Sequence, residues 1–382
     1  MSTDTDTDTD TDTDTDTDTL ISKFLEKESI YINFGEMMSS LIHRLMGSSD
    51  IEVHTIHYRV KDKKSLKNKI ENKKKYQSID EITDILGIRI ITYYSSDVDR
   101  VESVIRDHFI IDEENTIDKR KIYEPDRFGY MSLHYVVSLN NERCSLIEYS
   151  QFKDIKFEIQ IRTILQHTWA EIEHDLGYKT KNSVPDHIRR KFSILSGTLE
   201  LIDSSFIDIK ESLINYDSEL KEELSKQKPV IKNNNTRING IFIKNFIYGS
   251  TIFNDRYSAY LANKSEISKS RVIYPRGAKD DSNITYEYII SLLEYMKVIY
   301  PNEFIVLMND ILNDNKIIEF IDNYSNGWKK TSLFSKYFYL LFLLYAYVAF
   351  KDKNSLFNED ETPFCEIIER FRMFANKRNM SN

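Results

Sequence analysis

Cysteine, proline and glycine are all scarce in this chain of 382 residues. The two cysteines, Cys144 and Cys365, lie far apart and form no CxxC or Cys/His pattern, so neither a disulfide framework nor a zinc site is expected. The 6 prolines and 10 glycines are too few for a repetitive all-β chain. This composition favours long helices instead.

The chain also lacks a hydrophobic run long enough to span a membrane. Its most apolar stretch, FYLLFLLYAYVAF, covers the 13 residues from Phe338 to Phe350, whereas a span needs about 20. We therefore expect a buried core helix at this position and no membrane partner. The N-terminus has no basic segment followed by an apolar one, so we predict no signal peptide and a cytoplasmic location.

Residues 1–19 consist mainly of a Thr-Asp repeat, and residues 3–19 carry no apolar side chain. A segment that cannot bury apolar surface is expected to be disordered. Removing the eight aspartates of the repeat from the net charge of −9 leaves −1, so the acidic balance says little about partners. With 41% hydrophobic residues overall, the rest of the chain has a globular composition.

Strand and helix patterns interleave after the repeat and predict an α+β domain over residues 20–200, with one sheet. Its last predicted strands are GYMSLHYVVSL, CSLIEYS and IKFEIQIR, followed by a helix that ends at Gly177. A helical extension is expected over 201–227. The Asn-rich run KNNNTRING marks a linker at 228–240, and residues 241–382 are mainly helical in pattern.

Three cations and a hydroxyl gather where a predicted strand passes into a predicted helix, in HYRVKDKKSLKNKI. They are Arg59, Lys61, Ser65 and Lys69. Cations at such a junction can hold a polyphosphate, because each makes charge-assisted contacts with phosphate oxygens and the helix N-terminus adds backbone donors. The structural alternative is a solvated basic face of a helix.

Two carboxylates precede or lie within predicted strands. Asp84 comes just before the strand that contains Arg89, and it is either a turn residue or a ligand of Mg²⁺, which favours one or two carboxylates plus phosphate oxygens. In FEIQIRT the side chains of Glu158, Gln160 and Arg162 share one strand face, because successive side chains alternate. That face is either solvated or lines a pocket in which Glu158 is the second carboxylate.

A third polar face occurs in FGYMSLHYVV, where Tyr130, Ser132 and His134 lie on the same side of a predicted strand. A tyrosine beside a hydroxyl and an imidazole can stack on a nucleobase and bind a sugar or phosphate. Taken alone, the same pattern also fits a half-exposed strand.

The order of these motifs resembles the synthetase domain of the RelA/SpoT family, the alarmone synthetases. The matching elements are R-x-K-x-x-x-S-x-x-x-K, DILGIRI, GYMSLH, and EIQIRT followed by HTWAEIEHDLGYK, within residues 20–200. The resemblance implies a nucleotidyltransferase-like mixed sheet flanked by helices. Only the repeat and one helical stretch precede Arg59, so the similarity is to the small, synthesis-only type without a hydrolase domain.

The resemblance also implies an activity and residue roles. Such enzymes transfer the β,γ-pyrophosphate of ATP to the 3′-hydroxyl of GDP or GTP, which makes (p)ppGpp and releases AMP, with Mg²⁺ as cofactor. Carried onto this chain, the roles are catalysis and metal binding by Asp84 and Glu158; ATP binding by Arg59, Lys61, Ser65, Lys69 and Arg89; and acceptor binding by Tyr130, His134, Gln160 and Arg162, with Tyr130 stacked on the base.

One departure from the family pattern leaves the acceptor open. Many relatives carry a lysine four residues before the stacking tyrosine, whereas this chain has Asp126 there. The alternative function is therefore that of a toxin-like relative that pyrophosphorylates the tRNA 3′ end or an adenine nucleotide, with the C-terminal region as neutraliser or sensor. A third hypothesis is that the protein is a non-catalytic nucleotide sensor. For residues 241–382 an accessory or homo-oligomerisation role is the expectation.

Overall fold

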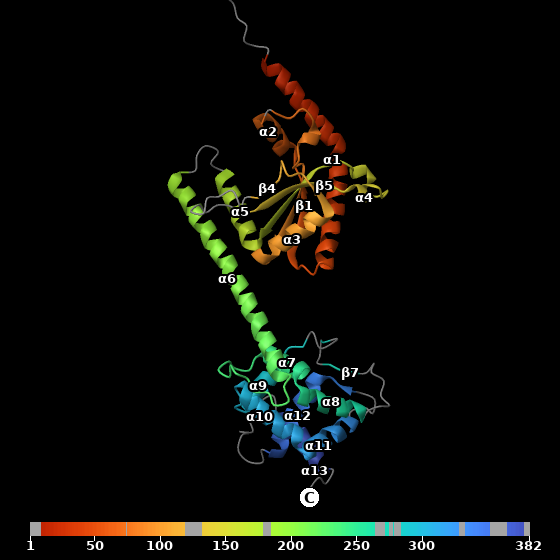
Figure 1. Ribbon diagram of the computed structural model, residues 1–382, viewed down its shortest axis with the longest axis vertical. Coiled ribbons are helices and arrows are strands. Elements are labelled where there is room, and N and C mark those ends of the chain that lie inside the picture. The colour runs from red at the N-terminus through yellow and green to blue at the C-terminus, as the bar shows by residue number, and fades with distance from the viewer. Residues whose placement is uncertain are drawn as a thin grey trace, which may run out of the picture. The chain divides into compact units, whose positions relative to one another are not determined.

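The computed structural model describes residues 9–73, 75–118, 132–178, 185–263, 272–274, 278, 284–327, 333–351 and 365–377. The chain forms two compact units, Met1–Lys210 and Glu211–Asn382. The division falls within helix α6 (Asp186–Leu224), a single long helix (Figure 1). Among the helices in the described ranges, none has the length and apolarity that a membrane crossing requires.

The first unit is built on one mixed sheet with the strand order β1-β2-β6-β5-β3, and β4 pairs with β5. The strands β2 and β6 are parallel, and the other pairs are antiparallel. Their bounds are β1 (Val53–Val60), β2 (Leu86–Thr92), β3 (Phe109–Ile111), β4 (Ile117–Asp118), β5 (Leu133–Leu139) and β6 (Phe157–Thr163). The expected mixed sheet flanked by helices is confirmed.

Alternation along the strands separates a core face from a polar face. Ile88, Tyr135 and Ile159 lie opposite one another on adjacent strands and are fully buried. They belong to one core with residues of α1 (Thr9–Ser48) and α3 (Ser95–His108). The other face carries the polar residues and contacts α5 (Ile164–Tyr178). Helix α2 (Lys63–Lys73) follows β1 and contacts α1.

Two local predictions for the first unit are wrong. The run CSLIEYS forms no strand: it begins in helix α4 (Asn141–Cys144) and ends in a 3-10 turn, Ser150–Phe152. Asn140 caps this helix by accepting from the backbone N–H of Arg143 at 2.9 Å. Within the run, Ile147 is 90% exposed, so its side chain has no core to pair against. An effective cap has outweighed the strand-like composition.

Residues 9–19 of the Thr-Asp repeat are helical, although the composition of the repeat predicts disorder. Helix α1 begins at Thr9, inside the segment expected to be disordered. Thr17 is buried, and Asp18 pairs with Lys67 at 3.7 Å. Once the apolar part of α1 is packed, adding a turn costs little because the helix is already nucleated, and aspartates near a helix N-terminus are favoured by the helix dipole.

The second unit is mainly helical, as predicted. Its helices are α7 (Gly240–Gly249), α8 (Thr251–Ala262), α9 (Glu287–Tyr295), α10 (Pro301–Asn313), α11 (Asn315–Gly327), α12 (Lys336–Lys351) and α13 (Cys365–Lys377), with two short parallel strands, β7 (Val272–Ile273) and β8 (Leu333–Phe334). The apolar run lies in α12, where Leu340, Leu343 and Leu344 are fully buried.

The segment expected to be a linker packs into this second unit. Ile231 and Ile238 are buried in its core, and the side chain of Asn302 bonds both the N–H and the C=O of Ile231. Leu220 and Leu224 at the end of α6 join the same core. Apolar residues inside the polar run KNNNTRING, and just before it, anchor the segment.

Gly35 allows α1 to approach β1 closely, which gives a test of this packing. A Cβ at position 35 would lie 2.8 Å from Cγ of the Tyr58 ring, closer than real Cβ contacts. We expect Gly35→Ala to lower the free energy of unfolding by about 1–2 kcal/mol, because overpacking outweighs the gain in helix propensity. Urea unfolding followed by circular dichroism measures the change.

The matched control is Gly47→Ala in the same helix, where no atom lies within 4 Å of the added Cβ. This variant should be neutral or more stable by up to about 1 kcal/mol. Equal stabilisation by both substitutions would show that the contact with Tyr58 imposes no constraint.

Candidate active site

The strand register gathers predicted site residues on the polar face of the sheet. Arg89 lies opposite Gln160, and Gln160 lies opposite His134, so three strands contribute one row of polar side chains. Two residues before Arg89 on β2, Gly87 lies opposite both Arg59 on β1 and Glu158 on β6. These positions share a face because they are two residues apart on each strand.

A pocket of about 260 Å³ opens on this face. Gly87 contributes no side chain at its floor, and a Cβ there would meet only the backbone oxygen of Arg59, at 4.0 Å. Seven of the predicted site residues line the pocket, together with Gly87 and His174: they are Arg59, Lys61, Ser65, Asp84, Arg89, Glu158 and Gln160. The two predicted catalytic carboxylates therefore face the same space.

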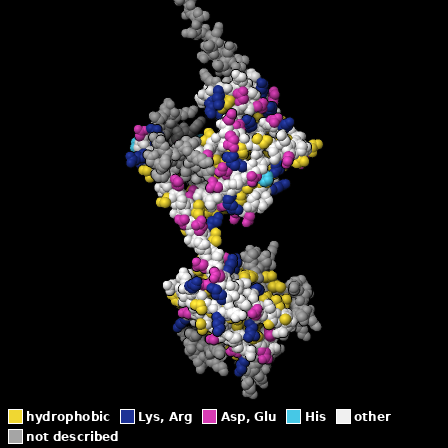
Figure 2. Space-filling view, viewed as in Figure 1, with side chains coloured by type: hydrophobic (Ala, Val, Ile, Leu, Met, Phe, Trp, Pro, Cys, Tyr) yellow, Lys and Arg dark blue, Asp and Glu magenta, His cyan; other side chains and the backbone are white. Residues whose placement is uncertain are grey.

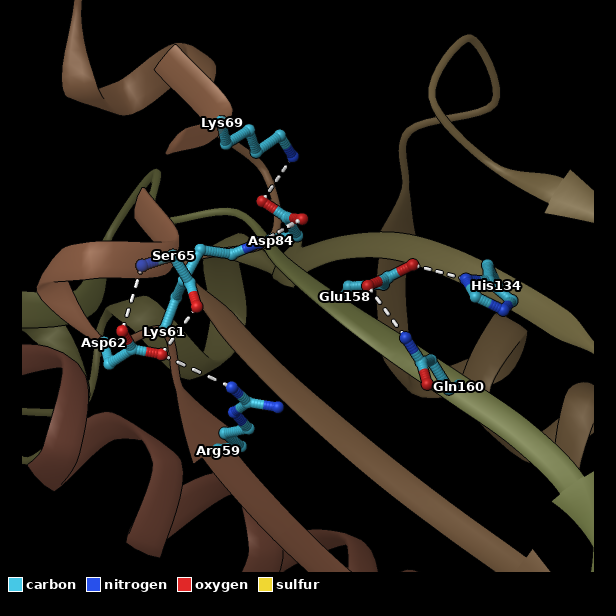
Figure 3. Close-up of polar contacts among 9 residues, drawn as sticks. All are labelled: Arg59, Lys61, Asp62, Ser65, Lys69, Asp84, His134, Glu158 and Gln160. Carbon is cyan, nitrogen blue, oxygen red and sulfur yellow. Dashed lines mark hydrogen bonds and ion pairs between the residues drawn. The ribbon is translucent and has the colours of Figure 1, made fainter. Parts of the chain in front are cut away.

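Asp84 lies in the turn before β2 and is held by two lysines (Figure 3). Lys61 Nζ lies 2.8 Å from one carboxylate oxygen, and Lys69 Nζ lies 2.6 Å from the other. Burial alone would favour the neutral acid, but the two ammonium groups outweigh it and hold the pKa of Asp84 below its usual range. The carboxylate is ionised at neutral pH.

Glu158 lies on β6 among polar groups that fix its orientation. His134 Nδ1 lies 2.5 Å from one carboxylate oxygen, and Gln160 Nε2 donates to the other at 3.1 Å. Burial raises the pKa of Glu158, but the contacts with His134 and Gln160 outweigh it, so the net pKa is lowered; the charge of Asp84 acts in the opposite direction. The second ring nitrogen of His134 lies 2.5 Å from the hydroxyl of buried Ser132.

The N-terminus of α2 is occupied by a side chain of the chain itself. Asp62 accepts from the Ser65 backbone N–H at 2.9 Å and from its hydroxyl at 2.7 Å, and Arg59 lies 3.5 Å from the same carboxylate. These bonds lower the pKa of Asp62. The sequence predicts phosphate at these donors, but the order Asp62-Lys63-Lys64-Ser65 is also typical of a capping aspartate, and the structure has the cap.

Two predicted arginines are directed toward α5. Arg89 forms an ion pair with Glu171 at 2.9 Å. Arg162 is almost fully buried; its guanidinium donates to Gln160 at 3.3 Å and lies 4.0 Å from Glu171. Glu171, and His174 in the pocket, were missed because HTWAEIEHDLGYK was interpreted as a helix and as part of the family match, with no residue of it assigned to the site. The signal was a carboxylate and an imidazole in a helix directly after a polar strand.

The carboxylates fit a divalent cation of the expected kind. Both carboxylates line the pocket, and the charge of Asp84 acts to raise the pKa of Glu158. Mg²⁺ typically takes one or two carboxylates and completes its shell with phosphate oxygens and water. In the described ranges, no cluster of three or more His, Cys, Asp or Glu side chains forms a complete protein cage. Tyr130 and Asp126 lie outside the residues that the structure describes.

Comparisons with known proteins show the family to which the chain is similar. The pattern described as "Region found in RelA / SpoT proteins" matches residues 58–183. The chain is 33% identical over 180 residues to the GTP pyrophosphokinase YwaC of Bacillus subtilis (strain 168), which covers 46% of this chain and 79% of that protein. It is 29% identical over 156 residues to the GTP pyrophosphokinase YjbM of the same organism, covering 40% and 69%.

A solved structure, that of the small alarmone synthetase 2 from Bacillus subtilis, is also similar. The alignment covers 50% of this chain and 99% of that one, with 26% sequence identity and a TM-score of 0.42.

The charge of Asp84 gives a prediction about stability. Because the folded-state pKa of Asp84 lies below 3.8, its carboxylate stabilises the fold above that value, and the contribution is lost as the pH falls through the lowered pKa. Asp84→Asn leaves two lysines unpaired and should cost about 1–2 kcal/mol at pH 7. Urea unfolding at pH 7 and at acidic pH compares the two proteins, and the difference should shrink in acid. A cost that is the same at both pH values would contradict the lowered pKa.

Proposed function

The chain belongs to the RelA/SpoT family, and from this membership we propose that it is a GTP pyrophosphokinase. It transfers the β,γ-pyrophosphate of ATP to the 3′-hydroxyl of GDP or GTP, makes (p)ppGpp and releases AMP. The observation that carries the proposal is one pocket lined by two ionised carboxylates and by cations, with Asp84 and Glu158 facing the same space as Arg59 and Lys61.

The reaction exchanges one bond to phosphorus for another. The 3′-oxygen of the acceptor bonds to the β-phosphorus of ATP, and the bond from that phosphorus to the oxygen bridging the α-phosphate breaks. AMP leaves with the bridging oxygen, and the hydroxyl proton passes to a carboxylate. Such transfers are accelerated mainly by positioning the reactants and by neutralising the charge that develops.

We assign to Glu158 the contact with the attacking 3′-hydroxyl of the acceptor. Its lowered pKa keeps it ionised, so it can accept a hydrogen bond from the attacking hydroxyl and then its proton. His134 and Gln160 hold one carboxylate oxygen each, which limits its rotation. A carboxylate of low pKa is a weak base, and its main contribution is therefore to orient the hydroxyl toward phosphorus.

We assign to Asp84, Lys61 and Lys69 the binding of Mg²⁺ and of the ATP phosphates, with Asp84 on the metal and the lysines on the phosphates. Mg²⁺ is the proposed cofactor, held by Asp84 and Glu158, and when bound it supplies positive charge to the phosphate oxygens. Lys61 and Lys69 keep Asp84 ionised. A lysine released from that carboxylate is a cation available to the phosphates of ATP.

The remaining assignments follow from position in the pocket. Arg59 and Ser65 reach ATP only if they leave Asp62, whereas Arg89 keeps a partner in Glu171. On the acceptor side we assign His134, Gln160 and Arg162. Tyr130 stays a prediction as the aromatic residue stacked on the acceptor base. A cytoplasmic location, where both nucleotides are present, is part of the proposal.

Transfer of label identifies the acceptor. Purified protein is incubated with γ-labelled ATP and Mg²⁺, and in turn with GDP, GTP, AMP, ATP and bulk tRNA, and the products are separated. Label on GDP and GTP, with release of AMP, is the expected result. Label on tRNA or an adenine nucleotide instead would replace the proposed acceptor, and no transfer to any acceptor would contradict the activity.

Removing either carboxylate tests the assigned roles. Glu158→Gln and Asp84→Asn should remain folded and lose transfer by at least about 100-fold, because each substitution is nearly isosteric but removes a charge from the reacting centre. Glu148→Gln, an exposed glutamate outside the pocket, is the matched control and should retain wild-type transfer. Near wild-type rates in Glu158→Gln or Asp84→Asn would refute its assignment.

A further inference from the structure

Ser132 lies beside the active-site pocket, but its side chain is buried. It is 1% exposed and directly precedes β5, two residues before His134. Its hydroxyl lies 2.5 Å from Nε2 of His134, and Ser132 is not among the residues that line the pocket. A hydroxyl buried in this way is out of reach of a nucleotide, so its part in the reaction acts through His134.

The strand register explains why Glu158 depends on His134. The residue directly opposite Glu158 on β5 is Val136, which is buried and has no polar side chain to offer. His134 lies diagonally, opposite Gln160, and its imidazole reaches the Glu158 carboxylate at 2.5 Å (Figure 3). Diagonal neighbours in an antiparallel pair lie within reach of aromatic side chains. The orientation of the ring therefore decides whether this contact forms.

The charge of Glu158 fixes which ring nitrogen of His134 carries hydrogen. The lowered pKa of Glu158 keeps the carboxylate ionised at neutral pH, and an ionised carboxylate only accepts hydrogen bonds, so Nδ1 donates. In a neutral imidazole Nε2 is then an acceptor, and the Ser132 hydroxyl donates to it. If the ring carries a second proton, the same hydroxyl accepts from Nε2–H. Ser132 therefore matches the ring in either state while Nδ1 faces Glu158.

The hydroxyl of Ser132 removes a freedom that the imidazole otherwise has. Rotation by 180° about χ2 would turn a ring carbon toward Glu158, and this torsion has two broad wells. The bond to Ser132 favours the well that places Nδ1 at the carboxylate. Hydrogen bonding at one ring nitrogen commonly sets the role of the other in this way.

Alignment at the reacting centre matters because the surface gives an anionic substrate little guidance. Side chains of both charges are interspersed over the face of the first unit that Figure 2 shows. Mixed charge exerts a weaker net pull on an anion than a field of one sign does. Contacts inside the pocket must then align the attacking hydroxyl, and a misplacement of about 1 Å can cost about 100-fold in rate.

We propose that Ser132 is a positioning residue for pyrophosphate transfer: by holding His134 it keeps the Glu158 carboxylate directed at the attacking 3′-hydroxyl. The inference rests on the proposed function, because that function assigns the hydroxyl contact to Glu158. The three side chains form one chain of hydrogen bonds, from Ser132 to His134 and from His134 to Glu158. Its outer member is sealed in the protein, and its inner member faces the pocket.

Steady-state kinetics of Ser132→Ala test this role. We expect kcat to fall about 10-fold while KM for ATP and for GDP changes by less than about 2-fold, because Glu158 is misaligned but the nucleotide contacts remain. Ser132→Thr keeps the hydroxyl and should restore most of the lost kcat. Ser138→Ala removes a half-buried hydroxyl on the same face of β5 and, as the matched control, should keep the wild-type kcat. An unchanged kcat in Ser132→Ala, or no recovery in a folded Ser132→Thr, would overturn the proposal.

A double-mutant cycle shows whether Ser132 acts through His134. Added to His134→Ala, the substitution Ser132→Ala should lower kcat no further, because the ring that the hydroxyl holds is gone. Losses that multiply in the double variant would show that the two residues act independently, and they would contradict the proposed chain.

The same cycle in stability separates this inference from the proposed function. Urea unfolding, followed by circular dichroism, compares the parent, the two single variants and the double variant. Ser132→Ala should destabilise the protein less in the His134→Ala background than in the parent, since the hydroxyl there has no ring to bond. Coupled losses in a parent that transfers no pyrophosphate would reject the activity alone. Additive losses would reject the role of Ser132.

Discussion

The parallel pairing of β2 with β6 is the constraint on which the site depends. Its register sets Gly87 beside Glu158 and Arg89 beside Gln160, and it leaves Ile88 and Ile159 on the buried face. A slip of one residue would turn Glu158 into the core and expose its apolar neighbours. Burial of those isoleucines therefore fixes the position of the carboxylate on the sheet, and its hydrogen bonds fix its orientation.

Charge in the pocket is balanced internally. Asp84 pairs with Lys61 and Lys69, Asp62 with Arg59, and Glu171 with Arg89. Each of these cations is paired with a carboxylate, and Lys61 and Lys69 share Asp84. Under the proposed assignment, binding of ATP exchanges these ion pairs for contacts with phosphate oxygens. Such an exchange favours ligands with several negative charges, since one phosphate group cannot replace several pairs.

Sequence patterns predicted the polar strand faces but not the partners across the site. The alternation in FEIQIRT and the order of the motifs were enough to predict that Asp84 and Glu158 line one pocket. The sequence places a carboxylate and an imidazole, Glu171 and His174, in a helix directly after a polar strand, but their approach to the sheet depends on how α5 packs, so no site role was predicted for them. The strand predicted for CSLIEYS does not form, because Asn140 caps a short helix at its start.

The hydrogen bond between Trp169 and the backbone of Phe192 has a practical consequence. The indole lies at the junction of α5 and α6, and the chain has only one other tryptophan, Trp328. With Trp328 replaced by phenylalanine, the tryptophan fluorescence of the protein, excited selectively over its 24 tyrosines, would report on that junction alone. A change in emission on adding nucleotide would then show, without any attached dye, whether α6 moves relative to α5, the helix that contributes His174 to the pocket.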